Sequence, residues 1–175
     1  MTIERVGLLK FGGNEVTIIG SNILVGQKAP DFTAVTQDWS TFNGLHDTKG
    51  KVRIIGSLPS LSTSVCDRET RRFNQEASGL DDRIIILTVS MDLPFTIKNW
   101  CAAAGVDRVI TLSDHKNDDF GQKYGVLVKE HRFLRRAVFV VDRNDKVIYS
   151  AYMPTIGDEP NYPEVLEAAR RALRD

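Results

Sequence analysis

The sequence predicts an α/β protein with a central mixed β-sheet flanked by helices. Residues 83–90, RIIILTVS, are almost continuously apolar and rich in β-branched side chains, which is typical of an interior strand covered on both faces. Strand and helix patterns alternate around this segment, as they do where crossover helices join parallel strands. Two further pairs of strand patterns are joined by short turns, so the sheet should also contain antiparallel pairs.

The chain opens with a predicted β-hairpin. Residues 6–11 and 15–20 have strand patterns, and the turn Gly12-Gly13-Asn14 between them suits positive backbone φ angles. Residues 32–37 then alternate like a strand. Residues 38–50 are polar and rich in turn formers, so we expect them to be a surface connection.

Strands and helices alternate through the middle of the chain. The predicted strands are residues 52–58, 83–90 and 109–113. The predicted helices run from Ser64 or Val65 to Ser78, from Pro94 to Gly105, and from Asn117 to Tyr124. A glycine follows or ends each helix, as is common at helix C-termini.

The C-terminal part predicts a second hairpin and a last helix. Strand patterns at 136–141 and 146–152 flank the turn residues 142–145. The last helix opens at Asn161-Tyr162-Pro163 and carries a stripe of apolar side chains at Val165, Leu166, Ala169 and Leu173. A thioredoxin-like α/β fold with an N-terminal β-hairpin satisfies this order of elements.

Length and composition indicate one globular domain, residues 1–175, in which residues 1–24 form a hairpin extension. The 23 basic and 23 acidic residues cancel, which argues against a nucleic-acid groove or attraction to an anionic membrane. No stretch approaches the roughly 18 apolar residues of a transmembrane helix, and no signal-peptide pattern opens the chain, so we expect a cytoplasmic protein. The three histidines are scattered, so no metal or cofactor is expected.

Two cysteines, Cys66 and Cys101, fit a catalytic or redox-sensing role better than a secreted disulfide scaffold. Cys66 falls in the first turn of a predicted helix, in the pattern P-x-x-x-T-x-x-C that begins at Pro59. A helix N-terminus or a neighbouring cation lowers the pKa of a cysteine from about 8.5 to roughly 3.5–7.5, which favours the nucleophilic thiolate. The alternative is that either cysteine is simply packed in the core.

Four segments together resemble the thiol peroxidase subfamily of peroxiredoxins over nearly the whole chain. They are PSLSTSVC (59–66), SMDLPF (90–95), VITLSD (109–114) and RAVFVVD (136–142). A second cysteine in the helix that follows SMDLPF points to the atypical two-cysteine type. The resemblance implies a thioredoxin-like fold, reduction of hydrogen peroxide and organic hydroperoxides, thioredoxin as the reductant, and a homodimer.

The resemblance also assigns roles to five residues. Cys66 matches the peroxidatic cysteine, Thr63 the threonine that orients thiolate and peroxide, and Pro59 the proline that shields the site from water. Arg136 matches the active-site arginine. Cys101 matches the resolving cysteine, which would form an intrachain disulfide with Cys66.

Strand alternation bears on the choice among Arg132, Arg135 and Arg136. It puts Arg136 on the face of residues 138 and 140 and Arg135 on the opposite face, so only one of them can point at the helix that carries Cys66. The resemblance selects Arg136, and we expect the other two to stay in water.

The residues after Cys66, Asp67-Arg68-Glu69, differ from the small residues that are more usual in the family. We expect the two acidic side chains to suit the first helical turn and to project away from position 66.

Two alternative functions use the same residues. A thiol-disulfide oxidoreductase on this fold normally needs C-x-x-C, whereas DRET follows Cys66. A redox sensor would pass its oxidation to a partner protein instead of turning over. In either the enzyme or the sensor, a disulfide needs Cα atoms within about 7 Å, so we expect local unfolding of one or both helix ends.

Overall fold

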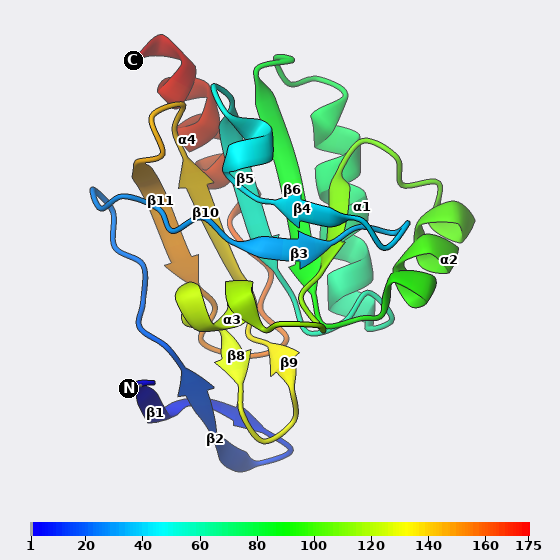
Figure 1. The fold of residues 1–175 in the computed structure, drawn as a ribbon, viewed down its shortest axis with the longest axis vertical. Coiled ribbons are helices and arrows are strands. Elements are labelled where there is room, and N and C mark those ends of the chain that lie inside the picture. Colours follow the sequence, from blue (N-terminus) through cyan, green and yellow to red (C-terminus); the bar gives the residue numbers. More distant parts are fainter. Residues whose placement is uncertain (1) are drawn as a thin grey trace.

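A seven-stranded mixed sheet forms the centre of the computed structural model (Figure 1). The structure describes residues 2–175, so Met1, the first residue of the predicted domain and of its hairpin extension, lies outside the described residues. In spatial order the strands are β11 (Val147–Tyr152), β10 (Ala137–Val141), β5 (Val52–Ser57), β6 (Ile84–Ser90), β7 (Ile110–Ser113), β3 (Thr33–Val35) and β4 (Thr41–Asn43).

The strand pairing confirms the predicted mixed sheet. Strands β5, β6 and β7 are parallel, with Val52 opposite Ile84 and Leu87 opposite Ile110. The outer pairs are antiparallel: β10 with both β5 and β11, β3 with β7, and β3 with β4. Strand β6 is therefore an interior strand with parallel neighbours on both sides, as its continuous apolar sequence predicts.

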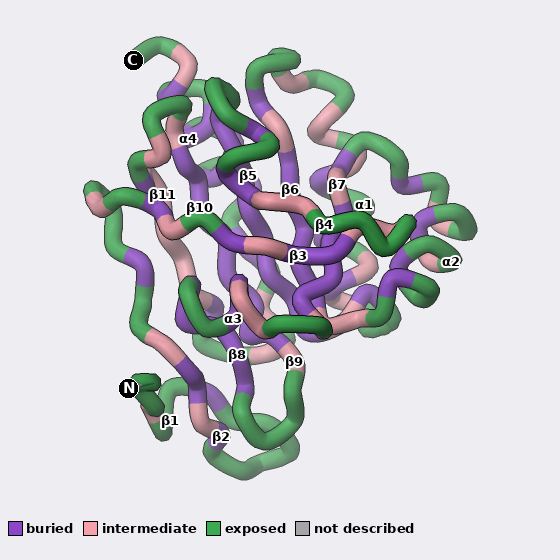
Figure 2. Tube along the Cα trace, viewed as in Figure 1, coloured by how far each residue is buried: buried purple, intermediate pink, exposed green. Residues whose placement is uncertain are grey.

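Helices cover both faces of this sheet. α1 (Ser64–Ala77), α2 (Pro94–Ala104) and α4 (Tyr162–Arg174) share one apolar cluster with alternate sheet residues such as Ile54 and Val138. α3 (Asp119–Lys123) packs in a second cluster with the residues between them, such as Ile55 and Phe139. Figure 2 shows the resulting buried strands at the centre. α2 ends at Ala104, and the next residue, Gly105, has a φ of 68°, which suits the position after a helix C-terminus.

A separate four-stranded sheet contains the predicted N-terminal hairpin. β1 (Glu4–Phe11) and β2 (Asn14–Ile19) are antiparallel, and the turn residues Gly12 and Gly13 have φ angles of 59° and 82°. The short strands β8 (Leu127–Val128) and β9 (Phe133–Leu134) complete the sheet beside the hairpin (Figure 1). The sequence did not predict these two strands, because two-residue strands are too short to show a period.

Residues 38–50 are more than the predicted surface connection. They contain β4 and a 3₁₀ helix, His46–Thr48, and both Leu45 and Thr48 are buried. The reason is Arg53 in β5, a fully buried side chain that donates to the Leu45 carbonyl at 2.9 Å and to Thr48 Oγ1 at 2.8 Å. A buried guanidinium needs acceptors, and this segment supplies two of them. Among the helices within residues 2–175, none combines the length and the apolar character of a membrane span.

Candidate active site

Cys66 is the third residue of α1 and lies fully buried against the sheet. The first backbone bond of the helix runs from Asp67 N–H to the Thr63 carbonyl at 2.9 Å, so the N–H groups of residues 64–66 precede the helical ladder. These N–H groups and the helix dipole favour negative charge at the sulfur. Both cysteines are free thiols.

The turn between β5 and α1 is held by Asp92, which follows β6. One carboxylate oxygen accepts the Leu61 N–H at 2.8 Å and the other accepts the Ser60 hydroxyl at 2.7 Å. Because β5 and β6 are parallel neighbours, their carboxyl ends meet at one edge of the sheet. Asp92 therefore fixes the turn that leads into Cys66, a contact that its place after an interior strand could have suggested.

Arg136 reaches Cys66 from the neighbouring strand. Ala137 in β10 is opposite Ser57 in β5, so Arg136 lies beside the point where the chain leaves β5 for the turn. Its side chain is buried, and Nη2 donates to Cys66 Sγ at 3.2 Å. It lies on the face of Val138 and Val140, as strand alternation predicts.

Glu69 completes this buried cluster, contrary to the expectation that it projects away from Cys66. Residues spaced three apart on a helix lie on the same face, so Glu69 lies on the face of Cys66. Glu69 is 1% exposed and accepts a hydrogen bond from Arg136 Nη1. Burial raises the pKa of Glu69 to about 7, although the positive charge of Arg136 lowers it. Burial alone would lower the pKa of Arg136. The interactions with Glu69 and Cys66 have the larger effect, so the pKa of Arg136 is raised.

Asp67 follows the expectation and points away from this cluster. Its carboxylate accepts hydrogen bonds from Arg71 Nε at 2.9 Å and from Trp100 Nε1 at 3.2 Å.

The prediction that Arg135 stays in water is wrong. Arg135 is 7% exposed, donates through Nε to the Met153 carbonyl at 3.0 Å, and lies over the ring of Tyr152 at 5.6 Å. An aromatic face and a buried carbonyl together replace water around its guanidinium. Arg132 is exposed as expected and pairs with Asp118.

Thr63 and Pro59 frame the turn. Pro59 is buried at its start, whereas Thr63 is exposed and is the N-cap residue of α1. The Thr63 hydroxyl donates to the Ser60 carbonyl at 3.0 Å, and among residues 2–175 no hydrogen bond joins Thr63 to Cys66. The structure thus brings Cys66 and Arg136 into direct contact, with Thr63 one helical turn earlier and its hydroxyl turned to the backbone.

Cys101 lies near the C-terminal end of α2, as predicted. It is 5% exposed, and its Sγ is 3.4 Å from Thr111 Oγ1. Burial raises the pKa of the Cys101 thiol, although the hydrogen bond with Thr111 lowers it. A surface pocket of about 350 Å³ reaches this cysteine, lined by Gln37, Lys98, Cys101, Ala102, Gly105, Val106 and Asp107.

Contacts beside the two cysteines join α1 to α2. Trp100 Nε1 donates to Asp67, the residue after Cys66, at 3.2 Å. Arg71 pairs with the same carboxylate, donates to the Ala104 carbonyl at 3.2 Å, and lies 5.6 Å from the centre of the Trp100 ring. These contacts hold both helix ends in their folded positions while the thiols are reduced.

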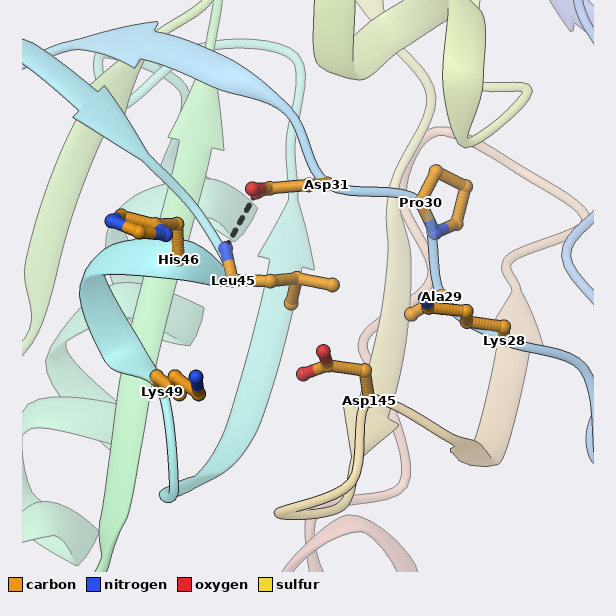
Figure 3. A pocket seen from close by; sticks show the side chains of 8 residues that line it. All are labelled: Lys28, Ala29, Pro30, Asp31, Leu45, His46, Lys49 and Asp145. Carbon is orange, nitrogen blue, oxygen red and sulfur yellow. Dashed lines mark hydrogen bonds between the residues drawn. The ribbon is translucent and has the colours of Figure 1, made fainter.

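Within residues 2–175, no group of three or more histidine, cysteine and acidic side chains is placed to hold a metal ion. A pocket of about 490 Å³ lies on another part of the molecule, and none of the five predicted site residues lines it (Figure 3). Figure 3 shows Asp31 in that pocket turned to the Leu45 N–H, to which it is bonded at 2.8 Å.

Comparison with known proteins agrees with this geometry. Residues 24–166 match the Redoxin family. A thiol peroxidase of Oceanobacillus iheyensis is 54% identical over 156 residues, covering 89% of this chain and 94% of that protein. A thiol peroxidase of Bacillus subtilis is 46% identical over 166 residues, covering 95% and 98%. A crystal structure of a peroxiredoxin-like protein from Aquifex aeolicus matches with a TM-score of 0.85 and 37% identity, covering 98% of both chains.

Proposed function

The chain belongs to the Redoxin family and is a peroxidase of the peroxiredoxin type, and on this premise we propose that it reduces hydrogen peroxide and organic hydroperoxides through Cys66. The observation that carries the proposal is the 3.2 Å contact between Arg136 Nη2 and Cys66 Sγ at the leading end of α1.

Arg136 suits the first step of this reaction. The Cys66 thiolate attacks one peroxide oxygen, a sulfur–oxygen bond forms, and the O–O bond breaks. The departing oxygen leaves with the electron pair and takes a proton from water, which gives water or an alcohol. A guanidinium keeps its charge and has several donors, so it can hold the sulfur and stabilise the departing oxygen together. Among the described residues Arg136 Nε has no acceptor, which leaves it as a free donor for a peroxide oxygen.

Thr63 and Pro59 have supporting roles in the proposal. The Thr63 hydroxyl would turn from the Ser60 carbonyl toward the sulfur or the peroxide when substrate enters. Pro59, buried at the start of the turn, would keep water from the thiolate.

The second step in the proposal is an intrachain disulfide. The Cys101 thiol attacks the Cys66 sulfenic acid, the two sulfurs bond, and water leaves. Cys66 and Cys101 are in different helices that the Trp100–Asp67 contact fastens together, so we propose that the helix ends open locally before the sulfurs meet. Thioredoxin, as a dithiol reductant, would then return both cysteines to thiols.

A coupled assay tests the proposal against a redox sensor. The chain is mixed with thioredoxin, thioredoxin reductase and NADPH, and peroxide is added in large excess. We expect NADPH oxidation to continue for many turnovers per chain and to stop in Cys66→Ser. Consumption of a single equivalent of peroxide per chain would support the sensor and contradict the enzyme.

We also propose that the protein acts as a homodimer. Trp39 and Phe95, which are 46% and 64% exposed, pack against each other with tilted rings whose centroids are 5.0 Å apart, and Leu93, two residues before Phe95, is 47% exposed. An exposed apolar group of this kind is suited to burial against a second copy. Sedimentation equilibrium should give twice the chain mass, and Phe95→Glu should give the monomer.

We further propose that residues 1–175 unfold as one domain. The proposed location is the cytoplasm, where thiols stay reduced.

A further inference from the structure

We propose that Ile156 is a positioning residue for Arg136 and that the N-terminal hairpin supports the active site through it. This inference rests on the proposed function of Arg136 at Cys66. It gives the hairpin, which contributes none of the predicted site residues, a defined part in the reaction.

Ile156 is joined to Arg136 through its main chain. Arg136 Nη2 donates to the Ile156 carbonyl at 3.2 Å, and the same nitrogen donates to Cys66 Sγ at 3.2 Å. Because the guanidinium is planar and Nη2 has only two protons, the direction of one bond sets the direction of the other. The position of the Ile156 carbonyl therefore helps to aim the guanidinium at the sulfur.

The side chain of Ile156 is held from the other side by the hairpin. It packs against a small apolar cluster made by Leu9, Val16, Ile18 and Val128. This cluster belongs to β1, β2 and β8, a sheet that is separate from the central one. Ile156 therefore connects the hairpin cluster, through its side chain, to Arg136 Nη2, through its carbonyl.

The segment around Ile156 forms a local turn, in which the Thr155 N–H donates to Asp158 Oδ2 at 3.1 Å and the Asp158 N–H to the Thr155 carbonyl at 3.5 Å. Residues 153–161 have no regular secondary structure, and Thr155 and Gly157 on either side of Ile156 are exposed. Residues 7–10 of the hairpin line a groove of about 280 Å³ together with Pro154 and Thr155. The hydrogen bonds of the turn fix residues 155–158 relative to one another, whereas the Ile156 side chain fixes the turn against the hairpin cluster, so loss of that side chain should free the Ile156 carbonyl.

The test compares five variants of the full chain, one of which, Arg136→Lys, changes the guanidinium itself. Ile156→Ala removes the anchor, Ile156→Val keeps most of it, and Leu9→Ala truncates a member of the hairpin cluster on which Ile156 packs. Val147→Ala is the matched control, because it truncates a buried side chain paired with Val141, at the end of β10 away from Arg136. Two quantities are measured at Cys66 by mass spectrometry of its peptide: the rate of oxidation by hydrogen peroxide, and the pH profile of alkylation by iodoacetamide.

We expect Ile156→Ala and Leu9→Ala to slow oxidation of Cys66 about tenfold, because small misplacements of a reacting group cost up to about 10²-fold. Their alkylation profiles should move to higher pH, since the guanidinium then stabilises the thiolate less well. Ile156→Val and Val147→Ala should stay within about twofold of the wild-type rate.

Three results would overturn the inference. One is a wild-type rate and profile in Ile156→Ala, and another is an equal loss in Val147→Ala, which would indicate general destabilisation. The third is an unchanged rate in Arg136→Lys, which would overturn the proposed role of Arg136 as well, so the two failures are distinguishable. If Ile156→Ala does not fold, Leu9→Ala decides the question from the other side of the contact.

Discussion

Replacing Arg136 by lysine tests whether the guanidinium acts on the sulfur. Lysine keeps the charge but loses the planar set of donors that contacts Cys66 and Glu69 together. A hydrogen bond to a charged group is worth about 1.5–3 kcal/mol, which corresponds to about a 10- to 150-fold lower rate. Loss of stabilisation at the departing oxygen adds to this effect, so we expect the reduction to lie in the upper part of that range.

The assay is a single-turnover oxidation. The reduced chain is mixed with excess hydrogen peroxide, quenched with an alkylating agent at set times, and the free Cys66 is counted by mass spectrometry. Arg135→Lys is the control, because Arg135 is the adjacent buried arginine on the opposite face and contacts Met153 and Tyr152 instead. A loss of less than about threefold in Arg136→Lys, or an equal loss in both variants, would refute the reasoning.

Three further predictions concern stability and the second step. Burial raises the pKa of Asp114 to about 7, above its unfolded value, so its contribution to stability is full below about pH 4 and is lost as pH rises through 7. Asp114→Asn should remove this pH dependence from urea unfolding curves. Between pH 5 and pH 8 the component amounts to at most about 3 kcal/mol, because about two pKa units fall in that window, and an unchanged pH dependence would contradict this. Glu69→Ala should lower the free energy of unfolding by about 3 kcal/mol at pH 8, because it leaves Arg136 buried without its carboxylate partner. Glu76→Ala, which breaks an exposed ion pair on the same helix, should lower it by less than about 1 kcal/mol. Trp100→Phe removes one hydrogen bond that holds α2 against α1, so disulfide formation after one equivalent of peroxide should be about 2- to 10-fold faster. A slower or equal rate would argue against this role of the hydrogen bond.

Much of the fold could be predicted from local patterns. The continuous apolar run at 83–90, the glycines after the helices and the turn at Gly12-Gly13 act within a few residues, and the elements they predict are confirmed. The thioredoxin-like class is confirmed by the mixed sheet and by the likeness to the Aquifex aeolicus structure. The short strands β8 and β9 and the burial of Leu45 depend on partners distant in the sequence, so no local pattern indicates them.

The site was predictable where a short motif or strand alternation applied. Strand alternation allowed only one of Arg135 and Arg136 to point at the helix of Cys66, and the resemblance selected Arg136, which contacts Cys66. Glu69 is three residues after Cys66, and this spacing places both residues on one helix face. The prediction that Glu69 projects away from Cys66 did not take this spacing into account. The positions of Arg135 and Ile156 could not be predicted from local patterns. The Met153 carbonyl and the Tyr152 ring fix Arg135, and the hairpin cluster fixes Ile156.

We propose that Cys66 reacts with peroxide and that Cys101 then reacts with Cys66. The most direct test is peptide mass spectrometry after one equivalent of hydrogen peroxide, with dimedone present to trap sulfenic acid. The wild-type chain should give a Cys66–Cys101 disulfide, Cys101→Ser should give a dimedone adduct at Cys66, and Cys66→Ser should keep its remaining thiol free. A sulfenic acid at Cys101 in Cys66→Ser, formed as fast as oxidation of the wild-type chain, would contradict the account.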